Sequence, residues 1–174
     1  MVPLALAGLD VRRGETVLDV GFGGGGLIAA LLEAGARAVG IDISEVAVRR
    51  ARRRFGERAR ILLGSAEALP LGDASVHKAA SLNSLYFWPA PAAAMAEFAR
   101  VVRPGGRLAI AFEPPEELRK WPGHRHGFRL FAEEEVRQLM AQAGFTDIRA
   151  AWGTGRKPDR FLCLTGVRSP GDAL

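Results

Sequence analysis

The sequence has almost no cysteine and no long apolar segment, and each shortage excludes a class of protein. Cys163 is the only cysteine in the 174 residues, which rules out an internal disulfide framework and a cysteine-rich zinc site. No apolar run approaches the roughly 20 residues that a membrane-spanning helix requires. Residues 1–9 also lack the basic stretch of a secretory signal. We therefore expect a protein that does not insert into membranes and that resides in the cytoplasm.

Lysine is also scarce, because arginine carries most of the positive charge. Only three of the 24 basic residues are lysines, and the net charge is +5. The densest basic group is residues 49–54, where every residue but Ala51 is arginine. Such a group can bind nucleic acid or phosphate, or it can form the solvated face of a helix. No aromatic residues are interleaved as stacking platforms, so a nucleic-acid partner is the weaker interpretation.

Apolar segments alternate with helix-like segments, which predicts a doubly wound α/β fold. A length of 174 residues suits one such domain. We expect five strands in the first two thirds of the chain, at 16–20, 38–43, 60–63, 76–82 and 107–112. Helices are expected at 26–34, 45–55, 91–102 and 133–143. Two last strands, at 145–151 and 159–167, have no helix between them and should form an antiparallel hairpin.

The most informative segment is the glycine-rich turn after the first expected strand. Five of the six residues 21–26 are glycine, and Asp42 ends the second expected strand 21 residues after Gly21. Such a loop lets backbone N–H groups approach a nucleoside cofactor, and a carboxylate at the second strand end can accept hydrogen bonds from ribose hydroxyls. The alternative is a plain tight turn with Asp42 as a helix cap. Five glycines exceed what a turn requires, so we favour a cofactor site.

Asp19 distinguishes between the candidate cofactors. It lies two residues before the first glycine, directly beneath the expected loop. Its carboxylate would repel the pyrophosphate of a dinucleotide but would attract a cationic amino group. S-adenosylmethionine carries an amino group and a sulfonium and has no phosphate, so it is the favoured cofactor. A nicotinamide reductase, which normally needs further strands or a substrate domain, is the disfavoured alternative.

Four segments resemble, in order, the motifs of class I S-adenosylmethionine-dependent methyltransferases, in the type 11 group related to enzymes of ubiquinone and menaquinone biosynthesis. They are Val-Leu-Asp-Val-Gly-Phe-Gly-Gly-Gly from residue 17, Val-Gly-Ile-Asp-Ile-Ser from 39, Gly-Ser-Ala-Glu-Ala-Leu-Pro-Leu from 64 and Glu-Phe-Ala-Arg-Val-Val-Arg-Pro-Gly-Gly-Arg-Leu from 97. The resemblance covers about residues 9–167. It implies a single Rossmann-like domain over 1–174 with a seven-stranded sheet of order 3-2-1-4-5-7-6, strand 7 being antiparallel.

The resemblance assigns the methionine and ribose ends of the cofactor to the first two motifs. Asp19, together with Gly21, Phe22 and Gly23, resembles the site for the methionine moiety. Asp42 resembles the ribose-binding acid. Phe22 stands where the family usually has a small residue, so the loop is a bulkier version of the family pattern.

The resemblance places the adenine and the reacting methyl group against later segments. Ile43 resembles a wall for the adenine ring, and Ser65, Ala66 and Glu67 resemble contacts to its edge. The family usually has an aspartate where Ser65 stands, so the hydrogen bond from the adenine amino group is weaker here or falls to Glu67. Asn83, just past the fourth strand, resembles a residue that lines the methyl-transfer cleft. No metal is implied.

The expected function is methyl transfer to a small-molecule substrate by in-line displacement, for which the protein mainly orients the acceptor and excludes water. A protonated acceptor also requires a general base, and the candidates are His124, His126, Tyr86 and Glu113. The two histidines lie in a long aromatic-containing segment, 113–131, which we expect to be a substrate-side loop. Local packing of the histidines, or core packing of Tyr86, is the alternative at each position.

Two other functions remain open from the sequence. One is an RNA or protein methyltransferase, suggested by the arginine group, and the other is a non-catalytic module that binds S-adenosylmethionine. Most relatives carry N-terminal helices over the substrate, whereas the first strand here begins about 15 residues into the chain. Either the cleft is open, or it is covered by the 113–131 loop or by a second subunit, as in a homodimer.

Overall fold

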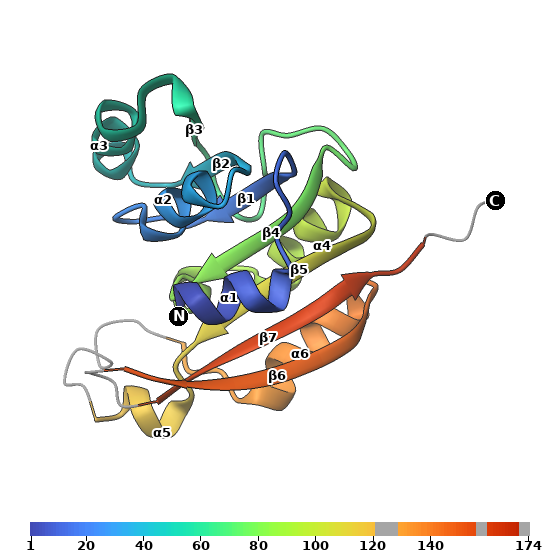
Figure 1. The fold of residues 1–174 in the computed structure, drawn as a ribbon. Helices are drawn as coiled ribbons and strands as arrows, with labels where there is room; N and C mark the ends of the chain where they lie inside the picture. Colours follow the sequence, from blue (N-terminus) through green and yellow to red (C-terminus); the bar gives the residue numbers. More distant parts are fainter. Residues whose placement is uncertain (121–128, 156–159, 171–174) are drawn as a thin grey trace.

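The computed structural model describes residues 1–120, 129–155 and 160–170, and these are built around one seven-stranded sheet (Figure 1). In chain order, the strands are β1 (Thr16–Val20), β2 (Arg37–Asp42), β3 (Ala59–Leu63), β4 (Val76–Leu82), β5 (Val102–Phe112), β6 (Phe145–Thr154) and β7 (Arg160–Arg168). Their spatial order is β3-β2-β1-β4-β5-β7-β6. The strand β7 is antiparallel to both β5 and β6, and the other pairs are parallel. The predicted strand order and the predicted antiparallel hairpin are confirmed.

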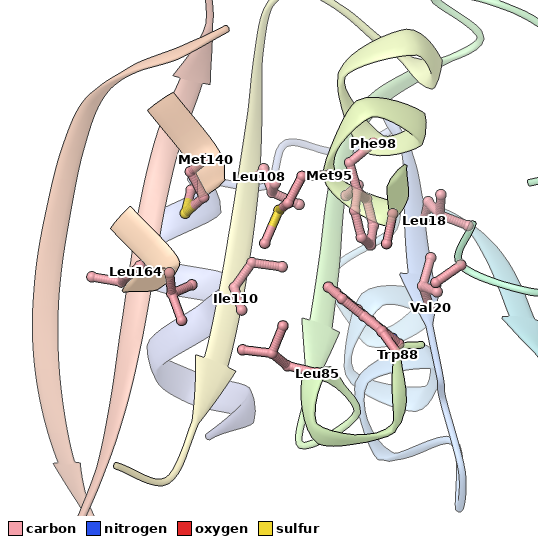
Figure 2. Close-up of a cluster of buried hydrophobic side chains, with 14 of the residues drawn as sticks. Leu18, Val20, Leu85, Trp88, Met95, Phe98, Leu108, Ile110, Met140 and Leu164 are labelled. Carbon is pink, nitrogen blue, oxygen red and sulfur yellow. The ribbon is translucent and has the colours of Figure 1, made fainter. Parts of the chain in front are cut away.

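Helices cover both faces of the sheet. They are α1 (Val2–Leu9), α2 (Gly26–Glu33), α3 (Glu45–Phe55), α4 (Pro91–Val101), α5 (Pro115–Leu118) and α6 (Glu133–Gln142), with short 3-10 helices η1 (Gly56–Arg58) and η2 (Leu85–Phe87). The buried residues of α1, α2 and α3 form one apolar cluster with one face of the sheet, and those of α4 and α6 form another with the opposite face. Figure 2 shows part of the second cluster, where Met95 and Phe98 of α4 meet Leu108 and Ile110 of β5.

Local sequence explains why α3 begins where it does. Ser44 is its N-cap, and the Ser44 side chain accepts a hydrogen bond from the backbone N–H of Ala47 at 3.3 Å. Glu45 lies in the first turn and arginines fill the last turn, which complements the helix dipole at both ends. The helix therefore starts directly after β2 and keeps the end of β2 in a fixed position.

The helix α1 was not predicted, because its sequence, Val-Pro-Leu-Ala-Leu-Ala-Gly-Leu, has no polar face that a helical period could reveal. It packs against β4, β5, β7 and α2, and Ala5 and Leu9 are fully buried there. Asp10 ends it in a left-handed conformation. The helix therefore covers the sheet, and none of its residues lines the cavity described below.

Two further elements differ from the predictions. The segment 113–131, expected to be irregular, contains the short helix α5. The strand β5 begins at Val102 rather than at 107, because Val76 of β4 pairs with Val102 before the register shifts and Lys78 pairs with Arg107. Within the described ranges, no helix combines the length and the apolar composition needed to cross a membrane.

Candidate active site

A cavity of about 320 Å³ lies at the carboxyl ends of β1, β2 and β4. The chain leaves β1 toward α2 on one face of the sheet and leaves β4 toward α4 on the other. Ligands of doubly wound folds bind at such a switch point. Four segments line the cavity: the glycine loop, the end of β2 with Ile43, residues 64–67 and residues 83–89.

The glycine loop comes close to other backbone segments and leaves open space toward the cavity. Gly21 has a φ of 73°, and a side chain there would place its Cβ 2.5 Å from the Cβ of Ser84. Gly23 has a φ of 48°, and a Cβ added to it would meet nothing within 4 Å. Glycine is therefore required at Gly21 by close packing, and at both positions by the backbone conformation.

Asp42 anchors this loop. Its Oδ2 accepts a hydrogen bond from the N–H of Gly23 at 2.9 Å, and its Oδ1 accepts one from the N–H of Ser44 at 2.8 Å. Asp42 also lines the cavity. A carboxylate has about four acceptor positions, so two remain for a ligand.

Asp19 and Phe22 lie beneath the loop and outside the lining of the cavity. Asp19 is 2% exposed, and no hydrogen bond from the described part of the chain reaches its carboxylate. Burial, and then the charge of Asp42, raise the pKa of Asp19 to about 8. Phe22 is buried in the cluster beneath α2 and α3, with its ring against Gly40. Phe22 therefore offers a ligand its backbone rather than its side chain.

The opposite side of the cavity carries a carboxylate oxygen without a partner. Ser65 donates a hydrogen bond to Oε2 of Glu67, and the Oγ of Ser65 accepts one from the N–H of Glu67 at 3.2 Å. The second oxygen, Oε1 of Glu67, is buried and has no partner among the described residues. Ile43, 77% exposed, also lines the cavity.

Comparison with known proteins identifies the family. A family model described as a methyltransferase domain matches residues 18–110. The uncharacterized methyltransferase YdaC of Bacillus subtilis is 30% identical over 163 residues, which cover 92% of this chain and 87% of YdaC. The chain belongs to the methyltransferase domain family. It is thus an S-adenosylmethionine-dependent methyltransferase, as the four motifs predicted.

Other relatives share most of this methyltransferase but are longer. The O-methyltransferase cnsE of Penicillium expansum is 33% identical over 174 aligned residues, which cover 81% of this chain and 57% of cnsE. Among solved structures, the 1,6-didemethyltoxoflavin-N1-methyltransferase of Burkholderia thailandensis, with bound 1,6-didemethyltoxoflavin and S-adenosylhomocysteine, is 26% identical with a TM-score of 0.79. That similarity covers 97% of this chain and 76% of the Burkholderia enzyme. The family and this neighbour imply that the methyltransferase uses S-adenosylmethionine.

The residues that line the cavity fit this cofactor. The open space at Gly23 admits a ligand against bare backbone, and the carboxylate of Asp42 has acceptor positions left for hydroxyl groups. The site therefore fits a cofactor that carries a ribose.

Among the predicted catalytic candidates, Tyr86 does not line the cavity. It is 4% exposed, and burial raises the pKa of its phenol. Its hydroxyl instead contacts Asn83 and the backbone of Glu113. His124 and His126 lie outside the described residues. Glu113, directly after β5, is the other described candidate, and like Tyr86 it contacts the cavity-lining residue Asn83.

Sequence reasoning missed Ser84. This residue lines the cavity and fills the space opposite Gly21. Its signal in the sequence is weak, because a small hydroxyl residue after a strand is common in any turn. Of the aromatic residues after it, Phe87 and Trp88 line the cavity, whereas Tyr86 does not.

Most of the arginine group has structural partners. Arg52 donates to the carbonyl of Ile61, Arg54 donates to the carbonyl of Gly24, and Arg49 pairs with Glu45. Arg52 and Arg54 therefore connect α3 to β3 and to the glycine loop.

Proposed function

We propose that this methyltransferase transfers the methyl group of S-adenosylmethionine to a small-molecule acceptor. The observation that carries the proposal is the lining of the cavity, which ends on Phe87 and Trp88 and includes no arginine or lysine within the described residues. An apolar wall with a few polar groups is typical of small-molecule sites, whereas nucleic-acid sites are basic. By their names, cnsE is an O-methyltransferase, and the solved Burkholderia enzyme holds the small molecule 1,6-didemethyltoxoflavin.

In this proposal, three carboxylates interact with three parts of the cofactor: the adenine, the ribose and the ammonium group. Glu67 accepts from the adenine amino group through Oε1, Asp42 accepts from the ribose hydroxyls, and Asp19 favours the ammonium group across the glycine loop. When bound, the cofactor supplies a methyl group already activated by a sulfonium. The remaining task of the chain is to hold the acceptor in line and to exclude water from the cleft.

The first experiment tests whether the protein binds the cofactor and whether Glu67 takes part. Isothermal titration should show binding of both S-adenosylmethionine and S-adenosylhomocysteine to the wild-type protein. Glu67→Ala should weaken both by about 10- to 100-fold, as expected for a hydrogen bond to a charged group. Glu57→Gln, at an exposed position of η1, is the matched control and should bind as the wild type does. S-inosylhomocysteine, which lacks the adenine amino group, should bind the wild type weakly and should lose little further affinity in Glu67→Ala.

The second experiment tests which class of molecule accepts the methyl group. The protein is incubated with S-adenosylmethionine and separate panels of phenols, carboxylates, amines, thiols, total RNA and a protein extract, and formation of S-adenosylhomocysteine is measured. The proposal predicts turnover with a small-molecule panel. Turnover only with RNA or protein would contradict it in favour of the macromolecular alternative. Cofactor binding without turnover on any panel would instead support a non-catalytic binding module.

A further inference from the structure

The turn that follows β4 connects the two sides of the active site. Asn83 and Ser84 both line the cavity. Asn83 adopts a left-handed conformation with a φ of 57°, which asparagine tolerates better than most residues. Its backbone N–H donates to the carbonyl of Ala111 in β5 at 2.9 Å. The turn is therefore held beside the end of β5 from its first residue.

Ser84 joins this turn to the cofactor side. Its hydroxyl contacts the hydroxyl of Ser81 and lies 3.3 Å from the carbonyl oxygen of Val20, the last residue of β1. Its side chain also occupies the space where a Cβ on Gly21 would lie. A displacement of Ser84 would therefore reach the glycine loop directly, without an intervening residue.

Asn83 joins the turn to the end of β5 through side-chain hydrogen bonds. Its Nδ2 donates to Oε1 of Glu113 at 3.1 Å, and its Oδ1 lies 3.3 Å from the hydroxyl of Tyr86. The same hydroxyl accepts a hydrogen bond from the backbone N–H of Glu113. Glu113 is 8% exposed, whereas Asn83 is exposed. Each end of the Asn83 amide thus has one partner within the protein, and these two contacts orient the turn.

We propose that Glu113 is a positioning residue for methyl transfer, which fixes the Asn83–Ser84 turn between the cofactor and acceptor sides of the cavity. Glu113 itself does not line the cavity, so it acts through Asn83 and not on the acceptor. For this role, the oxygen Oε1 of Glu113 has to accept a hydrogen bond from Asn83. Glu113 does not have to remove a proton from the substrate. The expected effect on methyl transfer rests on the proposed small-molecule function, whereas the positioning of the Asn83–Ser84 turn by Glu113 does not.

The variants Glu113→Ala and Glu113→Gln separate positioning from proton transfer. Glutamine keeps an oxygen that accepts from Nδ2 of Asn83, and alanine removes it. With an acceptor found by turnover, Glu113→Ala should lower kcat by about 100-fold, because misplacement by about 1 Å has that effect. The Kd for S-adenosylhomocysteine should rise by a smaller factor, at most about 10-fold, because the displaced turn touches the glycine loop whereas Glu113 itself does not line the cavity. Glu113→Gln should restore kcat to within about threefold of the wild type. Equal loss in both variants, or no loss in Glu113→Ala, would overturn the proposal.

A second readout needs no acceptor. In ¹H–¹⁵N spectra of the protein with S-adenosylhomocysteine, Glu113→Ala should shift the side-chain amide of Asn83 and the backbone amides of Ser84 and Gly21. Glu113→Gln should leave the backbone amides near their wild-type positions. Glu116→Gln, at an exposed position of α5, is the control and should shift none of them. Shifts confined to residue 113 and its neighbours in sequence would overturn the proposal. Absence of turnover in the wild type, with these shifts present, would count against the proposed function alone.

Discussion

Asp19 should release a proton when the cofactor binds. Its carboxyl group is 2% exposed, and its pKa is raised to about 8, first by burial and then by the charge of Asp42. At about pH 6.5 nearly every copy of the free protein therefore carries a protonated Asp19. A ligand ammonium group placed above the glycine loop favours the ionised carboxylate. Binding of S-adenosylhomocysteine should consequently release about one proton per site.

Calorimetry measures this release directly. The apparent binding enthalpy is determined in several buffers at the same pH, and its slope against the ionisation enthalpy of the buffer gives the number of protons released. 5′-Methylthioadenosine, which has no ammonium group, should release none, and neither should the Asp19→Asn variant. The reasoning is refuted if the wild type releases no proton, or if methylthioadenosine causes the same release as S-adenosylhomocysteine.

The same raised pKa predicts how stability depends on pH in the absence of cofactor. In the unfolded chain Asp19 ionises near 3.8, whereas in the fold it stays protonated up to about 8. The folded protein therefore binds the extra proton between these values, and its free energy of unfolding falls as the pH rises through that range. By pH 7 the loss is about 4 kcal/mol. Asp19→Asn should remove this dependence and be more stable than the wild type at pH 8 in urea denaturation.

Three further variants test the fold and the loop. Gly21→Ala forces a side chain into a positive-φ position beside the turn after β4. It should lower the affinity for S-adenosylhomocysteine at least about 10-fold in titration. The control Gly72→Ala, at a position with open space around it, should leave the affinity unchanged. Phe98→Ala empties a fully buried site and should cost about 3–5 kcal/mol in urea denaturation. Lys78→Met leaves the carboxylate of Glu15 without its buried partner and should cost about 3–5 kcal/mol near pH 7. Burial alone would raise the pKa of Glu15, but its contacts with Lys78 and Arg12 bring the pKa below the ordinary value of 4.5. The ionised Glu15 therefore stabilises the fold above pH 4.5. The difference in free energy of unfolding between Lys78→Met and the wild type should shrink as the pH falls below that value.

The positions of the strands were predictable because their information is local, whereas their order in the sheet came from the resemblance to the methyltransferases. Each of the central strands is a short apolar run bounded by glycine, proline or a capping residue, and the missing helix between β6 and β7 dictates a hairpin. The helix α1 was not predictable by the same means, since all its residues are apolar or small and its burial depends on contacts with β4, β5 and β7. Tertiary packing, and not the period of the sequence, decides where that segment lies.

The glycine-loop side of the cavity was more predictable than the Asn83 side for a physical reason. A glycine loop and a strand-end carboxylate act through backbone geometry, which a few adjacent residues determine. The contact between Asn83 and Glu113 joins positions 30 residues apart, through side chains whose direction depends on the left-handed turn at Asn83. Tyr86 is a second example. Its position just after Asn83 made it a candidate for the substrate cleft, but its packing places its hydroxyl against the backbone N–H of Glu113.

The two interpretations of Asp42, as a cap and as a cofactor ligand, are compatible in the structure. Its carboxylate holds the N–H groups of Gly23 and Ser44, so it shapes the loop before any ligand arrives. Replacing Asp42 would therefore disturb the loop as well as any contact to ribose, and a loss of affinity would not separate the two. Glu67 differs, because its Oε1 has no partner within the described chain and is not needed to hold a neighbouring segment. Glu67→Ala also removes the carboxylate that accepts from the Ser65 hydroxyl, so Ser65→Ala, which breaks that contact and keeps the Glu67 carboxylate, separates its loss from a loss of ligand recognition.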